Sequence, residues 1–221
     1  MGLNFLLQKL LDQKPDLASI PQTRQLGSPL YAAVCTGNKK AAEILCARGA
    51  DVNERCGTCA YALQAAARNE DLDMVILLLR HGAEVNGQSE DGETALMQAS
   101  RGRNIHIVRL LLQNGADINA QRRHYGTALC AAAARGGIEM VRLFLQEGAD
   151  INAQGDYGTA LGGAAASGKI EIVRLLLQEG ADIYARGSSG KPALQVAVNQ
   201  AKGDVVERRK SIPRYMGHHV Q

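Results

Sequence analysis

Tryptophan is absent from the 221-residue sequence, and aromatic residues make up only 4% of it. A core without large rings must be built from Leu, Ile, Val and Ala, as expected when many layers reuse one small structural unit. The apolar run at residues 3–11 is broken by Asn4, Gln8 and Lys9. This run is too short and too polar to be a signal peptide or a membrane span, so we expect no membrane partner.

The chain also lacks a strong excess of charge. Lys and Arg number 25 against 22 Asp and Glu, for a net charge of +3. This mildly basic balance does not by itself indicate nucleic acid or a membrane as a partner. The five cysteines are an odd number, which fits a reducing compartment better than a disulfide framework. We therefore expect a cytoplasmic or nuclear protein.

The sequence does contain an internal repeat. A leucine recurs at steps of 33, 33, 33, 32 and 33 residues, and a Gly-Ala-Asp/Glu motif follows it in register. Two markers in register over most of the chain predict one elongated solenoid with local contacts, because a unit this small buries its apolar surface only by stacking. The leucines are Leu30, Leu63, Leu96, Leu129, Leu161 and Leu194, and the alanines of the motif are Ala50, Ala83, Ala116, Ala149 and Ala181.

The clearest copy of the unit, residues 127–152, predicts two short helices and a turn. Thr127 is expected to cap the first helix through its hydroxyl, and Ser28, Thr94 and Thr159 hold the same slot. Gly136 and Gly137 are expected to end that helix, and Gly148 the second one, in a left-handed conformation. The wide apolar stripe after Gly137 must be covered by neighbouring units.

These residues resemble ankyrin repeats. The Thr-Pro-Leu-His-x-Ala pattern of that family appears as residues 127–132, and its Val-x-Leu-Leu-Leu-x-x-Gly-Ala-Asp-x-Asn pattern as residues 108–119. The match spans roughly residues 24 to 200, and the Tyr-Gly-Thr-Ala-Leu variant at 125–129 and 157–161 is similar to that of fungal ankyrin-repeat proteins. The resemblance implies an all-α ankyrin solenoid with finger loops, acting without catalysis as a protein-interaction module or scaffold.

The period divides the chain into repeats and two caps. The predicted ranges are an N-terminal capping half-repeat at 1–23, repeats at 24–56, 57–89, 90–122, 123–154 and 155–187, and a degenerate C-terminal capping repeat with a basic tail at 188–221. In the first cap, we expect Leu3, Leu6, Leu7 and Leu10 to cover repeat one.

Several copies depart from the pattern. Tyr61 stands in the Thr slot and loses the hydroxyl cap, which we expect to cost about 1 kcal/mol. Glu70 replaces the glycine between the helices, and Gly102 comes one place early. One residue is deleted between Asp150 and Leu161, so one finger is short.

Residues with reactive side chains do not converge on a catalytic site. Cys56 and Cys59 have ligand spacing, but a structural zinc site needs four ligands, and only Cys35 on the preceding helix could approach them. The five histidines, His81, His106, His124, His218 and His219, fit no catalytic motif. A recurring acidic slot at Asp51, Glu84, Asp117, Asp150 and Asp182 is expected to shape turns by accepting from nearby backbone N–H groups. We expect no enzyme, no metal and no cofactor.

Residues that differ between copies identify a candidate partner-binding face. The resemblance implies that the fingers and the inner faces of the first helices line a concave groove. Arg and Tyr are favoured at interface hot spots, and Arg presents a planar fork to carboxylate or phosphate. The leading hypothesis is a monomer whose groove binds an acidic or phosphorylated segment of another protein. The candidate residues are Arg68, Arg101, Arg122, Arg123, His124, Tyr125, Arg135, Tyr157 and Arg186.

Alternatives remain open at this point. The arginines could form a solvated face that only keeps the solenoid in solution. A pocket between fingers four and five could serve an unusual enzyme or a small-molecule binder. Nucleic acid could bind through the row of Arg68, Arg101 and Arg135 together with the tail at 208–210.

Overall fold

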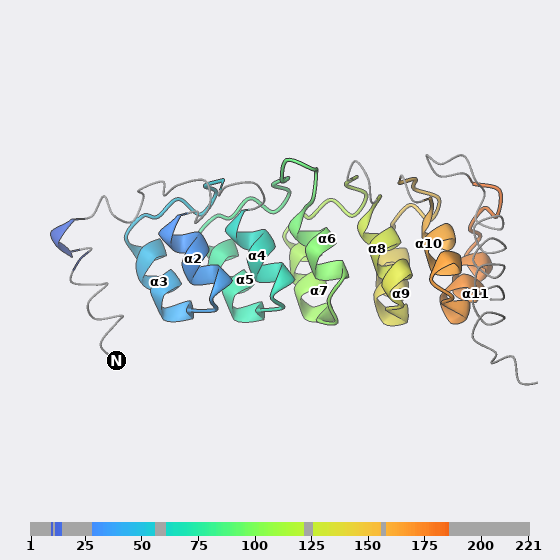
Figure 1. The fold of residues 1–221 in the computed structure, drawn as a ribbon, viewed down its shortest axis with the longest axis horizontal. Coiled ribbons are helices and arrows are strands. Elements are labelled where there is room, and N and C mark those ends of the chain that lie inside the picture. The colour runs from blue at the N-terminus through green and yellow to red at the C-terminus, as the bar shows by residue number, and fades with distance from the viewer. Residues whose placement is uncertain are drawn as a thin grey trace, which may run out of the picture.

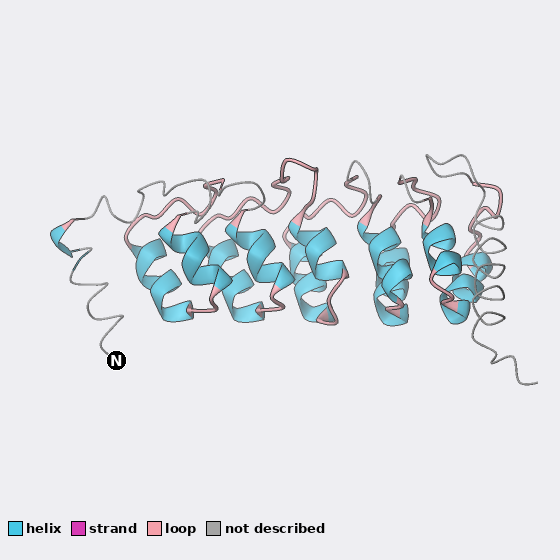
Figure 2. Ribbon diagram, in the orientation of Figure 1, coloured by secondary structure: helices cyan, strands magenta, loops and turns pink. Residues whose placement is uncertain are grey.

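The computed structural model describes residues 10, 12–14, 28–55, 61–121, 126–155 and 158–185. Within these ranges the chain forms helices joined by turns and no strand, so the predicted all-α solenoid is confirmed (Figures 1 and 2). Helix pairs stand side by side in a row, and the fingers project from one end of every pair (Figure 1). The first helices are α2 (Pro29–Cys35), α4 (Ala62–Arg68), α6 (Ala95–Ser100), α8 (Ala128–Arg135) and α10 (Ala160–Ala166). The second helices are α3 (Lys39–Ala47), α5 (Leu72–Arg80), α7 (Ile105–Gln113), α9 (Ile138–Gln146) and α11 (Ile170–Gln178).

Four of the five first helices begin directly after the Ser or Thr that was predicted to cap them. The side-chain oxygens of Ser28, Thr94, Thr127 and Thr159 each accept a hydrogen bond from the backbone N–H three residues on, at 3.2–3.4 Å. All four residues are buried. A buried, satisfied hydroxyl at this point supplies a partner for one of the unpaired N–H groups at each helix start.

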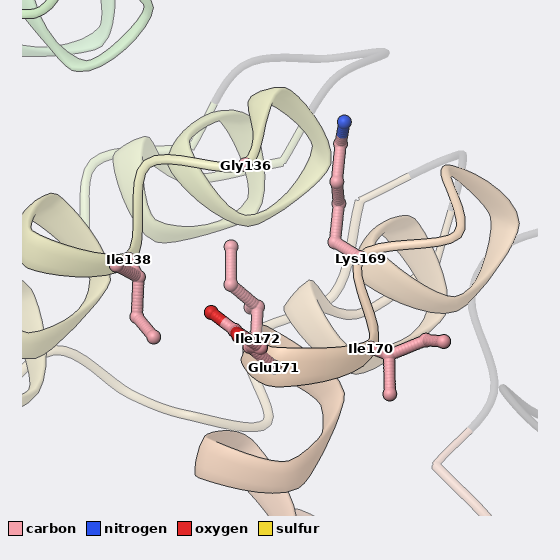
Figure 3. A pocket seen from close by; sticks show the side chains of 6 residues that line it. All are labelled: Gly136, Ile138, Lys169, Ile170, Glu171 and Ile172. Atoms are coloured by element: carbon pink, nitrogen blue, oxygen red, sulfur yellow. The ribbon is translucent and has the colours of Figure 1, made fainter.

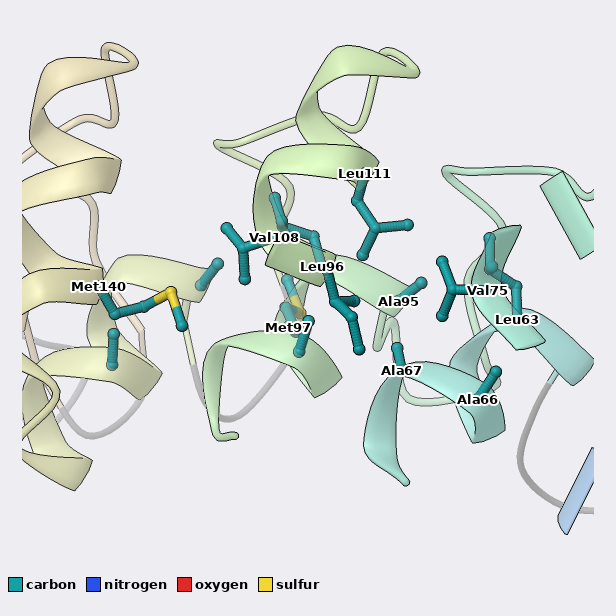
Figure 4. Close-up of a cluster of buried hydrophobic side chains, with 14 of the residues drawn as sticks. Leu63, Ala66, Ala67, Val75, Ala95, Leu96, Met97, Val108, Leu111 and Met140 are labelled. Atoms are coloured by element: carbon teal, nitrogen blue, oxygen red, sulfur yellow. The ribbon is translucent and has the colours of Figure 1, made fainter. Parts of the chain in front are cut away.

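The core runs through the array as one layer after another. The five described repeat leucines, Leu30, Leu63, Leu96, Leu129 and Leu161, are at most 3% exposed. Figure 4 shows Leu63, Leu96 and Val75 pointing into the space between neighbouring repeats, with Leu111 from α7 above them. Leu111 and Leu176 are both fully buried, as predicted. Alanines of the first helices fill the rest, and their small size lets those helices approach closely.

A ladder of asparagines joins each repeat to the next. Their side-chain oxygens accept hydrogen bonds from the backbone N–H of the acidic slot of the following repeat, at 2.7–2.9 Å. The sequence reasoning did not single out this slot, although the asparagine recurs in the motif. The ladder consists of Asn53 with Glu84, Asn86 with Asp117, Asn119 with Asp150, and Asn152 with Asp182.

The acidic slot shapes the turn before the finger, as predicted. At four of its five positions the carboxylate accepts from the backbone N–H two residues on, at 2.8–2.9 Å. The four are Asp51, Asp117, Asp150 and Asp182. The carboxylate thus accepts a hydrogen bond within its own repeat, and the asparagine accepts one from the following repeat.

Finger length follows the deletion. In the longer finger, the backbone N–H of Ser89 donates to the carbonyl of Glu93 at 3.0 Å. In the shorter one, Gly155 and Gly158 exchange two backbone hydrogen bonds, at 3.1 and 2.9 Å, in an isolated antiparallel bridge. Gly158 has φ +103, which a residue with a side chain rarely adopts. The missing residue therefore shortens the segment between the bonded residues from three residues to two.

Two departures from the pattern explain each other. Glu70 takes the left-handed conformation of the glycine it replaces, with φ +57, and its carboxylate accepts from the backbone N–H of Arg103 at 3.3 Å. A Cβ at Gly102 would lie 3.0 Å from that carboxylate. The early glycine of repeat three therefore makes room for the glutamate of repeat two.

Tyr61 begins α4 without a side-chain cap, as predicted. Its hydroxyl instead accepts from Arg55 Nε at 2.8 Å, and the Arg55 guanidinium lies 5.5 Å from the ring centroid. A Cβ at Gly87 would come within 2.9 Å of the ring. The aromatic ring therefore packs against the next finger in the place of a hydroxyl cap.

The N-terminal segment differs in part from its prediction. Leu10 is 51% exposed rather than buried on repeat one. The side-chain contact described between this segment and repeat one is ionic, between Asp12 and Arg48, so charge rather than Leu10 joins the two. The other cap leucines, the tail at 188–221 and Leu194 lie outside the described residues, and the proposed repeat boundaries stay predictions.

Candidate partner-binding face

Three of the candidate binding residues, Arg68, Arg101 and Arg135, are described. Arg68 is the last residue of α4, Arg101 immediately follows α6, and Arg135 is the last residue of α8. All three therefore lie at the C-terminal ends of successive first helices, as the repeat predicts. The other candidates, Arg122, Arg123, His124, Tyr125, Tyr157 and Arg186, lie outside the described residues.

Arg68 and Arg135 are exposed. Neither side chain makes a hydrogen bond or ion pair to the part of the chain that the structure describes. The two are not in the same register, since Arg68 follows its repeat leucine by five residues and Arg135 follows by six. One residue rotates a helical position by about 100°. The row is therefore staggered rather than straight.

Arg101 differs from both, because it is engaged within its own repeat. Its Nη1 forms an ion pair with Glu93 Oε1, and the two side chains are 26% and 10% exposed. Gln98 Nε2 donates to the second carboxylate oxygen of Glu93 at 2.8 Å. Charge-assisted bonds of this kind are stronger than neutral ones, so Arg101 is fixed against the finger.

The backbone of Glu93 is held as well. Its N–H donates to Ser89 Oγ at 3.0 Å, and its carbonyl accepts from Gln64 Nε2 of the preceding repeat at 2.8 Å. Gln64 is 2% exposed and also donates to the Gly87 carbonyl at 2.8 Å. A polar network therefore joins α4, α6 and the finger between them.

Sequence reasoning placed Arg101 and Glu93 on the same face but did not predict that the two form an ion pair. Glu93 stands where repeats four and five have Gly126 and Gly158. The sequence feature that could have revealed this ion pair is a glutamate directly before the capping threonine, at a position where the two later repeats have glycine. Its spacing of eight residues from Arg101 matches no helical pairing rule, because the two residues lie on either side of a helix start.

Family comparisons agree with this geometry. A model described as "Ankyrin repeats (3 copies)" matches residues 53–122 and 121–187, and one described as "Ankyrin repeat" matches residues 27–56. The chain belongs to the ankyrin-repeat family. Ankyrin repeats are generally non-enzymatic modules for protein–protein interaction. No curated protein sequence matches this chain closely enough to count as a relative.

The ankyrin array has a hollow between repeats four and five, away from the fingers. Its volume is about 230 Å³, and it lies between the starts of α9 and α11 (Figure 3). Gly136, Ile138, Lys169, Ile170, Glu171 and Ile172 line it. The predicted pocket between fingers four and five is a different place, and finger residues 122–125 and 156–157 lie outside the described ranges. Its lining combines three isoleucines with one lysine and one carboxylate, which form no catalytic grouping.

The described cysteines and histidines of the array supply no reactive centre. Burial raises the pKa of the Cys46 thiol and that of the Cys130 thiol, so neither is a thiolate at neutral pH. Cys35, His81 and His106 are exposed. No group of three potential metal ligands occurs among the residues that the structure describes. Cys56 and Cys59 lie outside them.

No helix within the described ranges is long and apolar enough to cross a membrane.

Proposed function

We propose that this ankyrin array binds an acidic or phosphorylated segment of another protein along the face formed by the ends of its first helices. The observation that carries the proposal is the state of Arg68 and Arg135. Both guanidinium groups are exposed, and neither is paired with a described residue. Such groups retain all five donors for a carboxylate or phosphate.

The positions of these arginines support binding by the face rather than solvation alone. The helix C-terminus carries a partial negative charge, which favours a cation there but leaves its outward donors available. Asn69 beside Arg68 uses its amide to bond the Cys35 carbonyl at 3.3 Å. The backbone that carries Arg68 is therefore held in place across two repeats, so little backbone entropy is lost on binding.

The proposal is tested with a fluorescein-labelled hexaglutamate peptide and its phosphoserine counterpart, by fluorescence anisotropy. Arg68→Glu/Arg135→Glu is expected to weaken binding of either peptide by about ten-fold or more, and wild-type affinity is expected to fall with added salt. Arg101→Glu is unsuitable here, because it would place a second carboxylate against Glu93.

The matched control is Arg109→Glu/Arg174→Glu. These two arginines are exposed on α7 and α11, which are second helices, and the variant makes the same change in net charge. We expect the control to keep its affinity within about two-fold, because long-range charge effects are screened by salt. Equal losses in both variants, or no loss in either, would refute a specific site at Arg68 and Arg135.

A further inference from the structure

The positive charge along the proposed binding face is interrupted at repeat three. Arg101 is paired with Glu93, a carboxylate whose side chain is only 10% exposed. A guanidinium in contact with a carboxylate has no net charge, and the potential of such a pair falls off faster than that of a single ion. An acidic ligand is therefore attracted to repeat three less strongly than to repeats two and four.

Arg103, the second arginine in the segment that follows α6, also has an acidic group nearby. Arg103 lies in the turn after α6, where the Glu70 carboxylate accepts from its backbone N–H at 3.3 Å. The neighbouring Gly102 has no side chain to offer, and it packs against the same carboxylate. The two arginines that directly follow α6 thus each have an acidic group nearby, Glu93 at the Arg101 guanidinium and Glu70 of repeat two at the Arg103 backbone.

Repeat four, in contrast, gains a second cation from its neighbour. The side chain of Lys169 lies along Gly136, the residue after Arg135, because a Cβ at Gly136 would be 3.0 Å from Lys169 Cε. Figure 3 shows the Lys169 side chain extending upward, away from α11. Arg135 and Lys169 therefore place two cations on adjacent repeats, both in the turn region where the first helix ends and the second begins.

The two positive regions are two helix spacings apart. Helix α6 packs against both α4 and α8, so it separates Arg68 from Arg135. Packed helices lie about 8–10 Å apart, which makes the separation about 20 Å. An extended chain covers this distance with about six residues.

We propose that the partner segment is bipartite: one acidic cluster contacts Arg68, a second contacts Arg135 and Lys169, and a neutral spacer of about six residues crosses repeat three. This inference rests on the proposed function and adds the charge pattern of the partner. Glu93 is the specificity-determining residue, because it removes repeat three from the positive surface.

The experiment compares two labelled peptides of equal charge, each with two glutamate triplets joined by prolines. Six prolines form a stiff spacer of about 19 Å, and two prolines one of about 6 Å. On the wild-type chain, the six-proline peptide is expected to bind about five-fold tighter or more, since a linker that matches the span gives the highest effective concentration.

Each result separates the inference from the function on which it rests. Equal affinities, or tighter binding of the two-proline peptide, would overturn the bipartite partner while leaving a site at Arg68 and Arg135. Binding of neither peptide, nor of hexaglutamate, would overturn the proposed function as well.

A variant tests the role of Glu93 directly. Glu93→Gln keeps an oxygen for Gln98 but removes the charge, so the two-proline peptide is expected to gain about five-fold and the preference to shrink. Glu90→Gln is the control, because Glu90 is exposed on the same finger and its removal changes the net charge equally. An unchanged preference in Glu93→Gln, or an equal gain in Glu90→Gln, would contradict this role for Glu93.

Discussion

Helices α8 and α10 meet through small residues, whereas polar side chains from α4 and the turn after it bond to the segments that flank α6. A Cβ at Gly163 would lie 3.5 Å from the Ala134 Cβ, so little separates the first pair of helices. Between α4 and α6, Gln64 reaches the finger, and Glu70 reaches the backbone of repeat three. Both boundaries share a packed core and an asparagine hydrogen bond, and the boundary between repeats two and three adds the hydrogen bonds of Gln64 and Glu70.

The comparison teaches where this solenoid tolerates change. A glycine or threonine can be lost at one position when a neighbouring repeat supplies a compensating contact, as Gly102 does for Glu70. The compensation links the stability of adjacent repeats, because the Glu70 side chain needs a residue without a Cβ at position 102.

The largest expected effect is the loss of a core leucine, which should be equally severe in both halves. Leu111→Ala in repeat three and Leu176→Ala in repeat five each leave a cavity at a fully buried position, at a cost of about 2–5 kcal/mol. Urea unfolding measures this cost. Leu177→Ala, at a position that is 44% exposed, is the control and should lose clearly less. Equal midpoints for Leu176→Ala and wild type would show that the layers do not pack as described.

The second effect distinguishes two arginines that look alike in the sequence. Arg101→Gln leaves Glu93 buried without its cation, which we expect to cost about 1–3 kcal/mol after allowance for partial exposure. Arg68→Gln removes an exposed side chain and should change stability by less than about 0.5 kcal/mol. Thermal unfolding of both variants checks the difference. If they lost the same stability, the Glu93 pair would have no structural role.

The smallest effect is the coupling between two repeats. Gly102→Ala forces the Glu70 carboxylate to move and should cost about 1 kcal/mol, whereas in a Glu70→Gly background it should be nearly neutral. A double-mutant cycle measured by denaturant unfolding gives the coupling. Additive effects would mean that the early glycine has another cause.

Much of the fold could be predicted because it depends on local rules. The leucine period, the threonine caps and Gly136 each act within one repeat, so the sequence pattern contains them. The asparagine ladder was missed although Asn119 and Asn152 recur in register, because a link to the next repeat shows only when two copies are placed together.

The candidate site was predictable only in part. The position of Arg68, Arg101 and Arg135 at helix ends follows from the repeat. Their different states do not, since the Glu93 pair depends on how the finger turns before α6. Arg135 is staggered because it follows its repeat leucine by six residues, whereas Arg68 and Arg101 follow theirs by five. This one-residue difference is easily overlooked when the three arginines are treated as one row.

Amide hydrogen exchange, followed by mass spectrometry with and without the six-proline peptide, tests the central claim most directly. The account predicts added protection at the end of α4 and around residues 134–137 and 169, with α7 unchanged. Protection confined to the second helices, or spread evenly along the array, would contradict a binding face at Arg68 and Arg135.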